Sequence, residues 1–462
     1  MHLNDTINKR PHLTFPRSPH HPQTRIPVQM KTPLLPELHS SATGGASVPG
    51  AVFNIATSII GAGIMSIPAT MRVLGVIPAL LVIAAVAFLS DSSVEFLTRY
   101  IGISTGSDSS ISYAGVMRES FGRLGSILLQ LCVALTNAGA LIMYLIIIGD
   151  VMAESSAEGV VHLGVLQEWF GRHWWSSREV VLFIITFGIM GPLSLFRRVG
   201  SLRFSSAISV LLAVVFMCIS SALAIYSLFQ GTAQTPRLLP DFSNQSFFEL
   251  FTAIPVIVVA FTFHFNVHPI RAELDKSSDM TMAVRISLLL CSVIYATVGL
   301  FGYLLFGEST MADILSNFDR GSGSAISPVL NDIVRLSYAL HLMLVYPLVN
   351  YSLRISIDEL FFPKARPLTS DKARFVSLTV ILLGALYLAA IAIPSIWTLF
   401  QFSGSTTAVC LSLIFPAAIA LRDIHGMSKR RDKILAAIMI VLAVVTSSIA
   451  IVSNVLTVVA GV

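Results

Sequence analysis

Apolar residues occur along this chain in long runs that are separated by short polar segments. A helix needs about 20 predominantly apolar residues to cross the hydrocarbon core of a bilayer. The pattern therefore predicts an all-α polytopic membrane protein with eleven transmembrane helices. The predicted spans cover approximately residues 48–71, 76–99, 124–151, 178–196, 204–229, 249–270, 282–306, 329–352, 373–392, 394–421 and 434–459.

The first predicted span is interrupted near its middle, where Gly61 and Gly63 are followed by Pro68. In lipid, an unwound turn leaves N–H and C=O groups without partners unless another helix or a bound polar ligand satisfies them. A half-helix that begins near Gly63 would direct free N–H groups and the positive end of its dipole at an anion such as a carboxylate. This predicts a solute site at mid-membrane. The alternative is that the two glycines only allow another helix to pack closely.

The sixth predicted span is interrupted in a similar way, because its apolar run turns polar between Phe261 and His268 and then reaches Pro269. Matched breaks in the first helices of two five-helix halves are the sequence pattern of an inverted-repeat transporter. We therefore predict discontinuous helices 1 and 6, and we expect the carbonyl groups of Phe261 and Thr262 to contact a substrate ammonium group. The repeats would cover about residues 46–230 and 248–422, with an extra helix at 434–459.

The first 45 residues differ from the rest of the chain, since they are rich in proline, histidine and basic residues. They contain no apolar core of the kind that a cleaved signal peptide requires. We therefore expect residues 1–45 to form a disordered cytosolic tail, and residues 46–462 to form the transmembrane transporter domain. Met30 is an alternative start of the protein.

Composition and the distribution of charge agree with this topology. The chain is 54% hydrophobic and 12% charged, and that charged fraction is about half of what soluble proteins contain. If the tail is cytosolic, the loops on its side hold 24 of the 30 lysines and arginines, including every lysine. Because cytosolic loops are enriched in these residues, we predict a cytosolic N-terminus. The sequon at Asn244 would then lie on the opposite side of the membrane.

Few residues match a catalytic or metal-binding pattern. The four cysteines all lie in apolar runs and form no CxxC pair or disulfide framework. The sequence offers no combination of nucleophile, base and metal ligands, so we do not predict an enzyme. We expect no cofactor and no nucleic-acid partner, and the long apolar runs predict the lipid bilayer as a partner.

Ionisable residues inside predicted spans are costly to bury and are therefore candidates for proton transfer. His264 and His268 share one face of a helix, which suits a proton or substrate role, a metal site if a third ligand exists, or structural packing. His341 lies in the eighth span, where a hydrogen bond to a neighbouring helix is the alternative. Asp91 and Glu95 lie near the cytosolic end of the second span, where they either contribute to a proton path or only cap the helix.

Three motifs of the chain resemble the amino acid/auxin permease family across roughly residues 44–460. They are Gly61-Ala62-Gly63-Ile64 with Pro68, His268-Pro269, and Phe402-Ser403-Gly404-Ser405-Thr406 with Phe415-Pro416. The branch that they resemble is that of the plant vacuolar amino-acid transporters, relatives of the sodium-coupled neutral amino-acid transporters. The resemblance implies a LeuT-like fold, a 5+5 inverted repeat plus one helix, which holds an amino acid between helices 1 and 6. The substrate-binding residues would be Thr57, Gly61, Ala62, Gly63, Phe261, Thr262 and Ser405.

The hydroxyl of Ser405 could instead bond across helices, as hydroxyls in spans often do. At one place the chain departs from the sodium-coupled members of the family. Residues that help to coordinate sodium in those members correspond to Thr57 and to Met343 or Val345 in this chain. A thioether or isopropyl group is a poor ligand for a hard cation, so we expect coupling to protons and not to sodium. The candidate coupling residues are His264, His341 and Asp91.

The resemblance further implies secondary active movement of amino acids out of the vacuole into the cytosol. The vacuolar membrane is therefore the expected location, with the plasma membrane as the alternative. Two other functions remain open from the sequence. An uncoupled uniporter would release amino acids down their own gradient, and an amino-acid sensor would use the N-terminal tail to bind regulators or to enter the occupied core.

Overall fold

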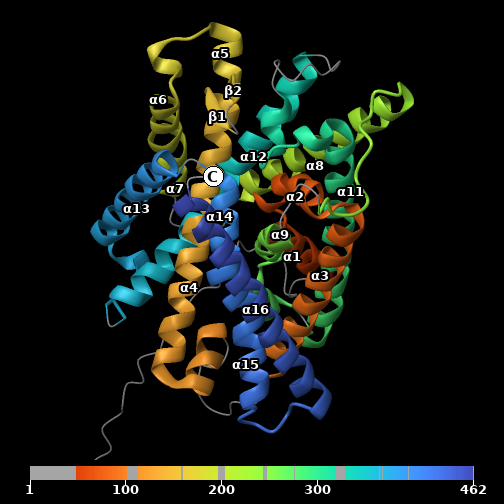
Figure 1. Ribbon diagram of the computed structural model, residues 1–462. Helices are drawn as coiled ribbons and strands as arrows, with labels where there is room; N and C mark the ends of the chain where they lie inside the picture. The colour runs from red at the N-terminus through yellow and green to blue at the C-terminus, as the bar shows by residue number, and fades with distance from the viewer. Residues whose placement is uncertain are drawn as a thin grey trace, which may run out of the picture. The chain divides into compact units, whose positions relative to one another are not determined.

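The part of the chain that the structure describes is almost entirely helical (Figure 1). The structure is a computed structural model, and it contains one antiparallel pair of strands, β1 (Ser155–Ala157) and β2 (Val160–His162). The predicted tail and the sequon at Asn244 lie outside the described residues. The described residues are 48–100, 112–157, 160–195, 203–242, 247–274, 276–318, 328–363, 365–366, 368–393 and 395–460.

Nine helical segments within these ranges are long and apolar enough to cross a membrane. A tenth is formed if α1 (Val48–Ile59) and α2 (Gly63–Leu74), which are bent by 61° relative to one another, count as one broken span. The prediction of a helical polytopic membrane protein agrees with this finding. The number eleven stays a prediction, because the range 178–196 contains only short helical pieces that do not meet the length of a span.

The long helices account for most of the predicted spans. In chain order they are α3 (Val76–Arg99), α4 (Tyr113–Met152), α8 (Arg203–Phe229), α9 (Phe247–Ala260), α11 (Met280–Phe306), α12 (Pro328–Phe361), α13 (Lys372–Ala392) and α16 (Arg430–Ala460). Two further helical segments contain π-helical turns, which are rare and often occur at functional sites. One consists of α6 (Arg178–Phe183), η3 (Ile184–Met190) and α7 (Gly191–Ser194), and the other of α14 (Ile396–Ser403), η11 (Gly404–Ala408), η12 (Cys410–Ile414) and α15 (Phe415–Arg422).

The helices differ in how deeply they are buried. In α4 and α12, 67% of the most apolar stretch is buried, whereas the value is 28% for α13 and 22% for α16. The first two helices therefore form the centre of the helix assembly, and the last two lie at its periphery. The large side chains exposed on the peripheral helices are apolar, and lipid tails can cover such a surface without loss of hydrogen bonds. Examples are Ile381, Leu388, Val441 and Leu456.

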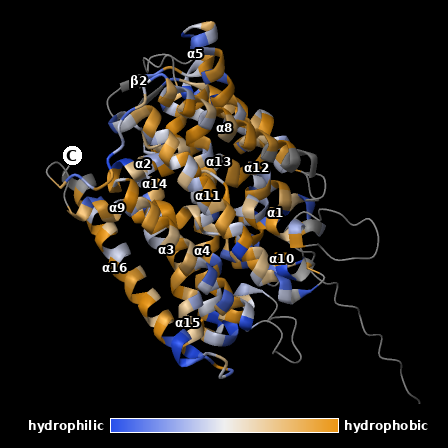
Figure 2. Cartoon of the chain, turned by 90° about the vertical axis from the view of Figure 1, so that its right-hand side faces the viewer, coloured by the Kyte–Doolittle hydropathy of each residue, from blue (hydrophilic) through white to orange (hydrophobic). Residues whose placement is uncertain are grey.

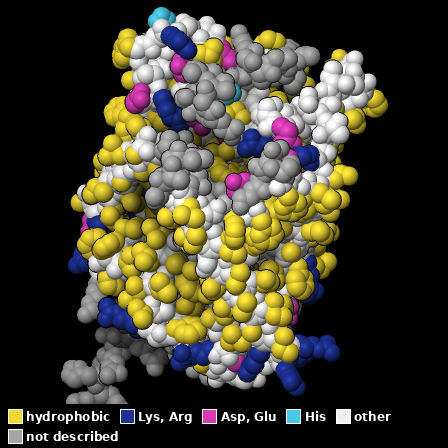
Figure 3. All heavy atoms as spheres, in the orientation of Figure 1, with side chains coloured by type: hydrophobic (Ala, Val, Ile, Leu, Met, Phe, Trp, Pro, Cys, Tyr) yellow, Lys and Arg dark blue, Asp and Glu magenta, His cyan; other side chains and the backbone are white. Residues whose placement is uncertain are grey.

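Polar residues gather at the two ends of the helix assembly, and a broad band of apolar side chains lies between them (Figures 2 and 3). We name these the α5 end, which carries α5 (Val165–Phe170) and the two strands, and the α15 end, which carries the loop between α15 and α16 (Figure 1). Ion pairs hold the elements together at each end. At the α5 end, Arg237 pairs with Glu308 at 2.6 Å, and Arg335 pairs with Glu168 at 2.9 Å.

Candidate functional site

The break between α1 and α2 leaves backbone groups outside the helical hydrogen-bond pattern. Among the described residues, no acceptor pairs with the N–H groups of Gly61 and Ala62. The Tyr338 hydroxyl donates to the Gly61 carbonyl at 2.7 Å, the Met65 amide donates to the Ala62 carbonyl at 3.1 Å, and the Tyr295 hydroxyl lies 2.8 Å from the Ile59 carbonyl. The Ile60 carbonyl accepts no hydrogen bond from the described residues. The break therefore presents two unpaired N–H groups at the start of α2, which suits an anion.

A second break follows α9, which ends at Ala260, before the short elements η5 (His264–Asn266) and α10 (Val267–Glu273). Here the pattern is reversed. The N–H groups of Phe261 and Thr262 still donate back into α9, whereas their carbonyl groups accept no hydrogen bond from the described residues. This break therefore presents acceptors, which suits a cation such as an ammonium group.

The two breaks lie in contact with each other. A Cβ atom added at Gly63 would lie 2.7 Å from Cβ of Ala260 and 2.9 Å from its Cα, so only a glycine allows this approach. The Tyr295 hydroxyl lies 2.8 Å from the Ile59 carbonyl and 2.9 Å from the Ala260 carbonyl, so its single proton is shared between the two breaks. Donors from one interrupted helix and acceptors from the other thus lie side by side near the middle of the apolar band.

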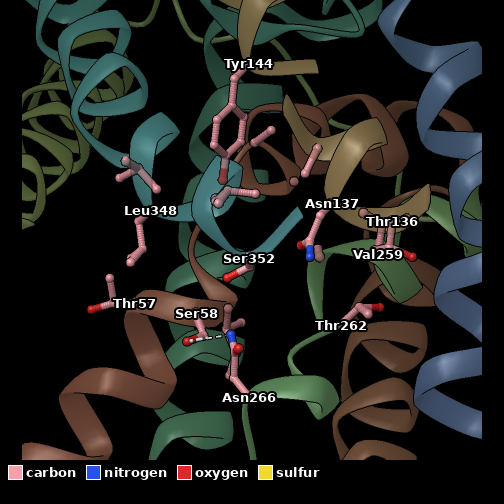
Figure 4. Close-up of a pocket in the computed structure, with 18 of the residues that line it drawn as sticks. Thr57, Ser58, Thr136, Asn137, Tyr144, Val259, Thr262, Asn266, Leu348 and Ser352 are labelled. Carbon is pink, nitrogen blue, oxygen red and sulfur yellow. Dashed lines mark hydrogen bonds between the residues drawn. The ribbon is translucent and has the colours of Figure 1, made fainter. Parts of the chain in front are cut away.

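A cavity of about 140 Å³ lies at this place (Figure 4). A water molecule requires roughly 10–15 Å³ on this measure, so the cavity has room for about ten groups of that size. Its walls come from both breaks and from α4, α12 and α14. In the close-up, Tyr144 points into the cavity from one side, and Asn266, whose amide donates to Ser58 at 3.3 Å, reaches it from the opposite side.

Five of the seven predicted substrate residues line this cavity, and two do not. The lining includes Thr57, Gly61, Ala62, Gly63 and Thr262. The side chain of Phe261 is fully buried and packs edge-on against Tyr295, with ring centroids 5.2 Å apart. Ser405 donates its hydroxyl to the Gln401 carbonyl at 2.7 Å, within its own interrupted helix. For Ser405 neither reading from the sequence describes this arrangement, because its hydroxyl bonds the carbonyl four residues earlier, as serine and threonine hydroxyls commonly do within helices.

Several lining residues were not identified from the sequence. Asn137 of α4 is 3% exposed, and its Nδ2 has no hydrogen-bond partner. The Tyr144 hydroxyl lies 3.0 Å from where a Cβ atom on Gly61 would be, so it is next to the free N–H groups. The available signal was one asparagine inside the largely apolar run 124–151. On its own, that signal does not separate a ligand-binding amide from one that bonds a neighbouring helix.

None of the three predicted proton-coupling residues lines the cavity. His264 is fully buried, with its ring centroid 5.0 Å from that of Phe263, and it lies beside the backbone of Ser90 in α3. His341 is buried next to Tyr338, with ring centroids 4.9 Å apart. Asp91 forms an ion pair with Arg285 at 3.1 Å, and therefore links α3 to α11 at the α15 end.

The remaining polar candidates also have structural partners. His268 stacks on Tyr113, with ring centroids 5.9 Å apart and an interplanar angle of 10°. Glu95 pairs with Arg99, which also pairs with Asp432 of α16. Across the described ranges, no three side chains of His, Cys, Asp or Glu come close enough to hold a metal ion. The polar part of the cavity lining consists of backbone amides, hydroxyls and the carboxamides of Asn54, Asn137 and Asn266, a set that can bind a small zwitterion.

Comparison with known proteins was made at the level of sequence and of fold. Residues 44–459 match the family model described as "Transmembrane amino acid transporter protein". Amino acid transporter AVT6C of Arabidopsis thaliana is 55% identical over 429 residues, which is 92% of this chain and 98% of the relative. Sodium-coupled neutral amino acid symporter 2 of Danio rerio is 26% identical over 436 residues, which is 88% of this chain and 82% of the relative.

Among solved structures, the crystal structure of MhsT in complex with L-phenylalanine is similar to this chain. The TM-score is 0.52 at 15% identity, and the match covers 90% of this chain and 100% of the other. At that identity the likeness establishes a shared LeuT-type fold and nothing about the ligand. The inverted-repeat architecture expected from the two breaks is consistent with this fold.

Proposed function

The chain belongs to the transmembrane amino acid transporter family, which is a family of transporters and not of enzymes, and from this premise we propose that it is a proton-coupled exporter of amino acids. One observation supports the substrate site above all others. Unpaired N–H groups of Gly61 and Ala62 and unpaired carbonyl groups of Phe261 and Thr262 belong to two breaks that lie in contact. A free amino acid carries an anion and a cation on one carbon atom, and the two breaks offer a partner for each.

The amino acid is held in one orientation in this proposal. Its carboxylate accepts hydrogen bonds from the N–H groups at the start of α2, where the helix dipole also favours a negative charge. The Tyr144 hydroxyl lies beside these groups and donates to the same carboxylate. The ammonium group donates to the carbonyls of Phe261 and Thr262, and the substrate side chain extends toward Asn137, Val349 and Phe400.

The proposed topology has eleven spans, with the α15 end in the cytosol. The α6–η3–α7 segment is then the fourth span, the repeats are 46–230 and 248–422, and the tail 1–45 is cytosolic. The distribution of lysines and arginines supports this orientation. A cysteine at Thr235, an exposed position of the α5 end, should react with an impermeant thiol reagent only from the non-cytosolic side. Reaction from the cytosol would overturn the orientation.

In this topology, the cavity lies in the cytosolic half of the helix assembly. Its lining in α12 runs from Val345 to Ser352, in the half of the helix nearer the α15 end, and its lining in α1 runs from Phe53 to Ile59. On the α5 side of the breaks, Arg335 and Tyr338 of α12 are almost completely buried. With the α15 end in the cytosol, this arrangement is a state closed to the vacuolar lumen.

Coupling to protons and not to sodium is supported by the site itself. Val345 lines the cavity with an apolar side chain, and the Thr57 hydroxyl donates within its own helix to the Phe53 carbonyl at 2.8 Å. Neither is arranged as one of the several oxygen ligands that a hard cation needs. The acidic vacuolar lumen then supplies the driving force, as protons accompany the amino acid into the cytosol.

The test is uptake of labelled amino acids into proteoliposomes that contain equal substrate inside and outside. Separate samples receive a pH step, a sodium step or no step. We expect accumulation above equilibrium with the pH step alone, and its loss when a protonophore collapses the gradient. Accumulation with the sodium step would overturn proton coupling. Equilibration without accumulation in every sample would leave the uniporter, and no flux for any amino acid would reject transport.

A further inference from the structure

The segment that follows α11, of which the structure describes residues 307–318, contains a buried carboxyl group. Asp313 is 3% exposed, and its Oδ1 accepts a hydrogen bond from the Leu315 amide at 3.0 Å. Its Oδ2 is buried and has no hydrogen-bond partner among the described residues. The loop itself is held in place, because the Asn317 side chain accepts from the Met311 amide and donates to the Ser309 carbonyl, both at 2.8 Å. A buried carboxyl group with one unpaired oxygen is unfavourable when it is charged.

The loop is joined directly to the interrupted first span. The Ser66 hydroxyl of α2 donates to the Ala312 carbonyl at 2.6 Å, one residue before Asp313. On the other side, α12 packs against the short helix η8 (Ile314–Phe318) that follows Asp313, and it also donates from Tyr338 to the Gly61 carbonyl at 2.7 Å. A shift of this loop therefore reaches the first-span break through two separate contacts.

The arginines described on the neighbouring helices have hydrogen-bond partners other than Asp313. From α12, Arg335 donates to Glu168 at 2.9 Å and to the Leu163 carbonyl at 2.7 Å. From α4, Asp150 faces the loop with a negative charge and is itself paired with Arg178 of α6. From α2, Arg72 donates to the Glu308 carbonyl at 3.5 Å. Among the described residues, Tyr338 of α12 is a further titratable group that interacts with Asp313.

Some of these surroundings raise the pKa of Asp313 and others lower it, and the net effect is a rise. Burial raises the pKa of Asp313 to about 8, the negative charge of Asp150 adds to the rise, and the Leu315 amide and the distant charge of Arg335 oppose it. An aspartate exposed to water has a pKa of about 3.9. The closed α5 side therefore holds Asp313 neutral at the pH of either compartment, whereas a hydrated α5 side would leave it charged.

We propose that Asp313 is a proton-binding site of the α5-side gate, and that this side of the cavity closes only when the Asp313 carboxyl has taken up a proton. The gating part rests on the proposed function, since it assigns the gate to the transport cycle. Closure then binds one proton, so the ratio of closed to open protein changes by up to about tenfold per pH unit between the two pKa values. With the α5 end in the lumen, luminal acid drives the closure that precedes release of the amino acid to the cytosol.

The proton site is tested on the purified full-length protein in lipid nanodiscs. Infrared difference spectra between acidic and alkaline pH report the carbonyl band of a neutral carboxylic acid. We expect a band in the wild type that disappears with a midpoint near pH 8, is absent in Asp313→Asn and persists in Glu308→Gln. Glu308 is the matched control, because it lies in the same loop region but is exposed and paired with Arg237. A wild type without such a band overturns the proposal, even if Asp313→Asn does not fold.

The gate is tested by labelling, which needs no transport. A cysteine at Thr136, in the cavity wall, is labelled from the α5 side and compared with a cysteine at the exposed Thr235, after subtraction of the labelling of the native cysteines. We expect the Thr136 to Thr235 ratio to rise with pH from 6 to 9, and to stay constant when Asp313→Asn is added. A ratio that still rises in Asp313→Asn overturns the gate.

The two tests separate this inference from the proposed function. If the infrared band and the labelling ratio depend on Asp313 but proteoliposomes transport no amino acid, the proposed function fails and the proton-binding gate remains. If proteoliposomes accumulate amino acids with a pH step, and Asp313→Asn changes neither the infrared spectrum nor the labelling ratio, the proposed function remains and the gate is rejected.

Discussion

Two aspartates at opposite ends of the helix assembly have opposite surroundings. At the α5 end, Asp313 is buried with one carboxyl oxygen unpaired, and its pKa is raised to about 8. At the α15 end, Oδ1 of Asp423 accepts from the Met427 amide at 2.7 Å and the Ser428 amide at 3.0 Å. Oδ2 of Asp423 lies 3.0 Å from Nζ of Lys433. Burial would raise the pKa of Asp423, but Lys433 and these hydrogen bonds lower it to about 2.

The difference shows how one fold can respond to pH at one end and not at the other. Asp423 stays charged from pH 5 to pH 8 and closes the turn between α15 and α16 as a permanent anion. Asp313 has a pKa raised to about 8 while it is buried and an ordinary pKa when it is hydrated, so its proton is linked to a movement that exposes it. Under the proposed function, titration at the α5 end and constant charge at the α15 end suit a carrier whose α5 end faces an acidic lumen.

The largest effect is expected for Asp313→Asn measured by unfolding at pH 5 and pH 9. A raised folded-state pKa contributes stability that is complete below about pH 4 and is lost as the pH rises through about 8. Asparagine removes that loss, so the variant should gain stability over the wild type on the order of 5 kcal/mol at pH 9 and little at pH 5. Equal effects at the two pH values would contradict a titrating Asp313, and Glu308→Gln is the control.

A smaller effect, without pH dependence, is expected for Asp423→Asn. Asparagine tolerates the left-handed backbone at this position (φ 44°), so the substitution tests the charge and not the turn. We expect a loss of about 1–3 kcal/mol, as for other buried hydrogen bonds to charged groups. The lowered pKa means that the contribution is present above about pH 4 and is lost only as the pH falls through about 2. The difference in the free energy of unfolding between Asp423→Asn and the wild type should therefore be the same at pH 5 and pH 8. A difference that changes between these pH values would contradict a permanently charged Asp423.

Between the two ends, Gly61→Ala tests the substrate site. The added methyl group would lie 3.0 Å from the Tyr144 hydroxyl, in the space assigned to the carboxylate. We expect substrate affinity to fall about tenfold, or about 1.4 kcal/mol, with little change in the amount of folded protein. Binding is measured on purified protein. The control is Gly384→Ala, where an added Cβ meets no atom within 4 Å. Unchanged binding in Gly61→Ala would show that the substrate carboxylate does not bind at the N-terminus of α2.

Gly63→Ala should behave differently, because its methyl group would collide with the backbone of Ala260. A collision with backbone cannot be relieved by moving the end of a flexible side chain. We expect reduced expression of folded protein for this variant, measured by size-exclusion chromatography. Normal folding together with lost binding would instead assign Gly63 to the substrate and not to packing between the breaks.

The smallest effect is expected for two matched tyrosines. Tyr338→Phe removes the donor to the Gly61 carbonyl, and Tyr100→Phe removes a hydroxyl that donates to Asp423 at 3.0 Å. Each should cost about 1 kcal/mol of stability. Only Tyr338→Phe should also weaken substrate binding, since it alone contacts the break. Similar binding in both variants would show that the α5 side is not connected to the site through α12.

The sequence determined the features that depend on neighbouring residues. A backbone in lipid must satisfy its own hydrogen bonds, so apolar runs of span length and their interruptions at Gly61–Pro68 and Phe261–Pro269 are readable from the chain itself. The same local reasoning identified Gly61, Gly63 and Thr262, and the family resemblance added Thr57 and Ala62; all five line the cavity. It did not find Asn137, because an isolated asparagine in an apolar run has the same pattern whether it binds a ligand or another helix.

Only the tertiary structure decided how charged and polar groups are paired. Asp91 is as conspicuous in the sequence as any carboxylate in a span, but Arg285, almost two hundred residues away, neutralises it. Asp313 lies in an ordinary polar connection, and it is buried because its loop packs against α2 and α12, including a hydrogen bond from Ser66 to Ala312. Burial and ion pairing depend on contacts between distant parts of the chain, and those contacts set the pKa of Asp313 and the pairing of Asp91.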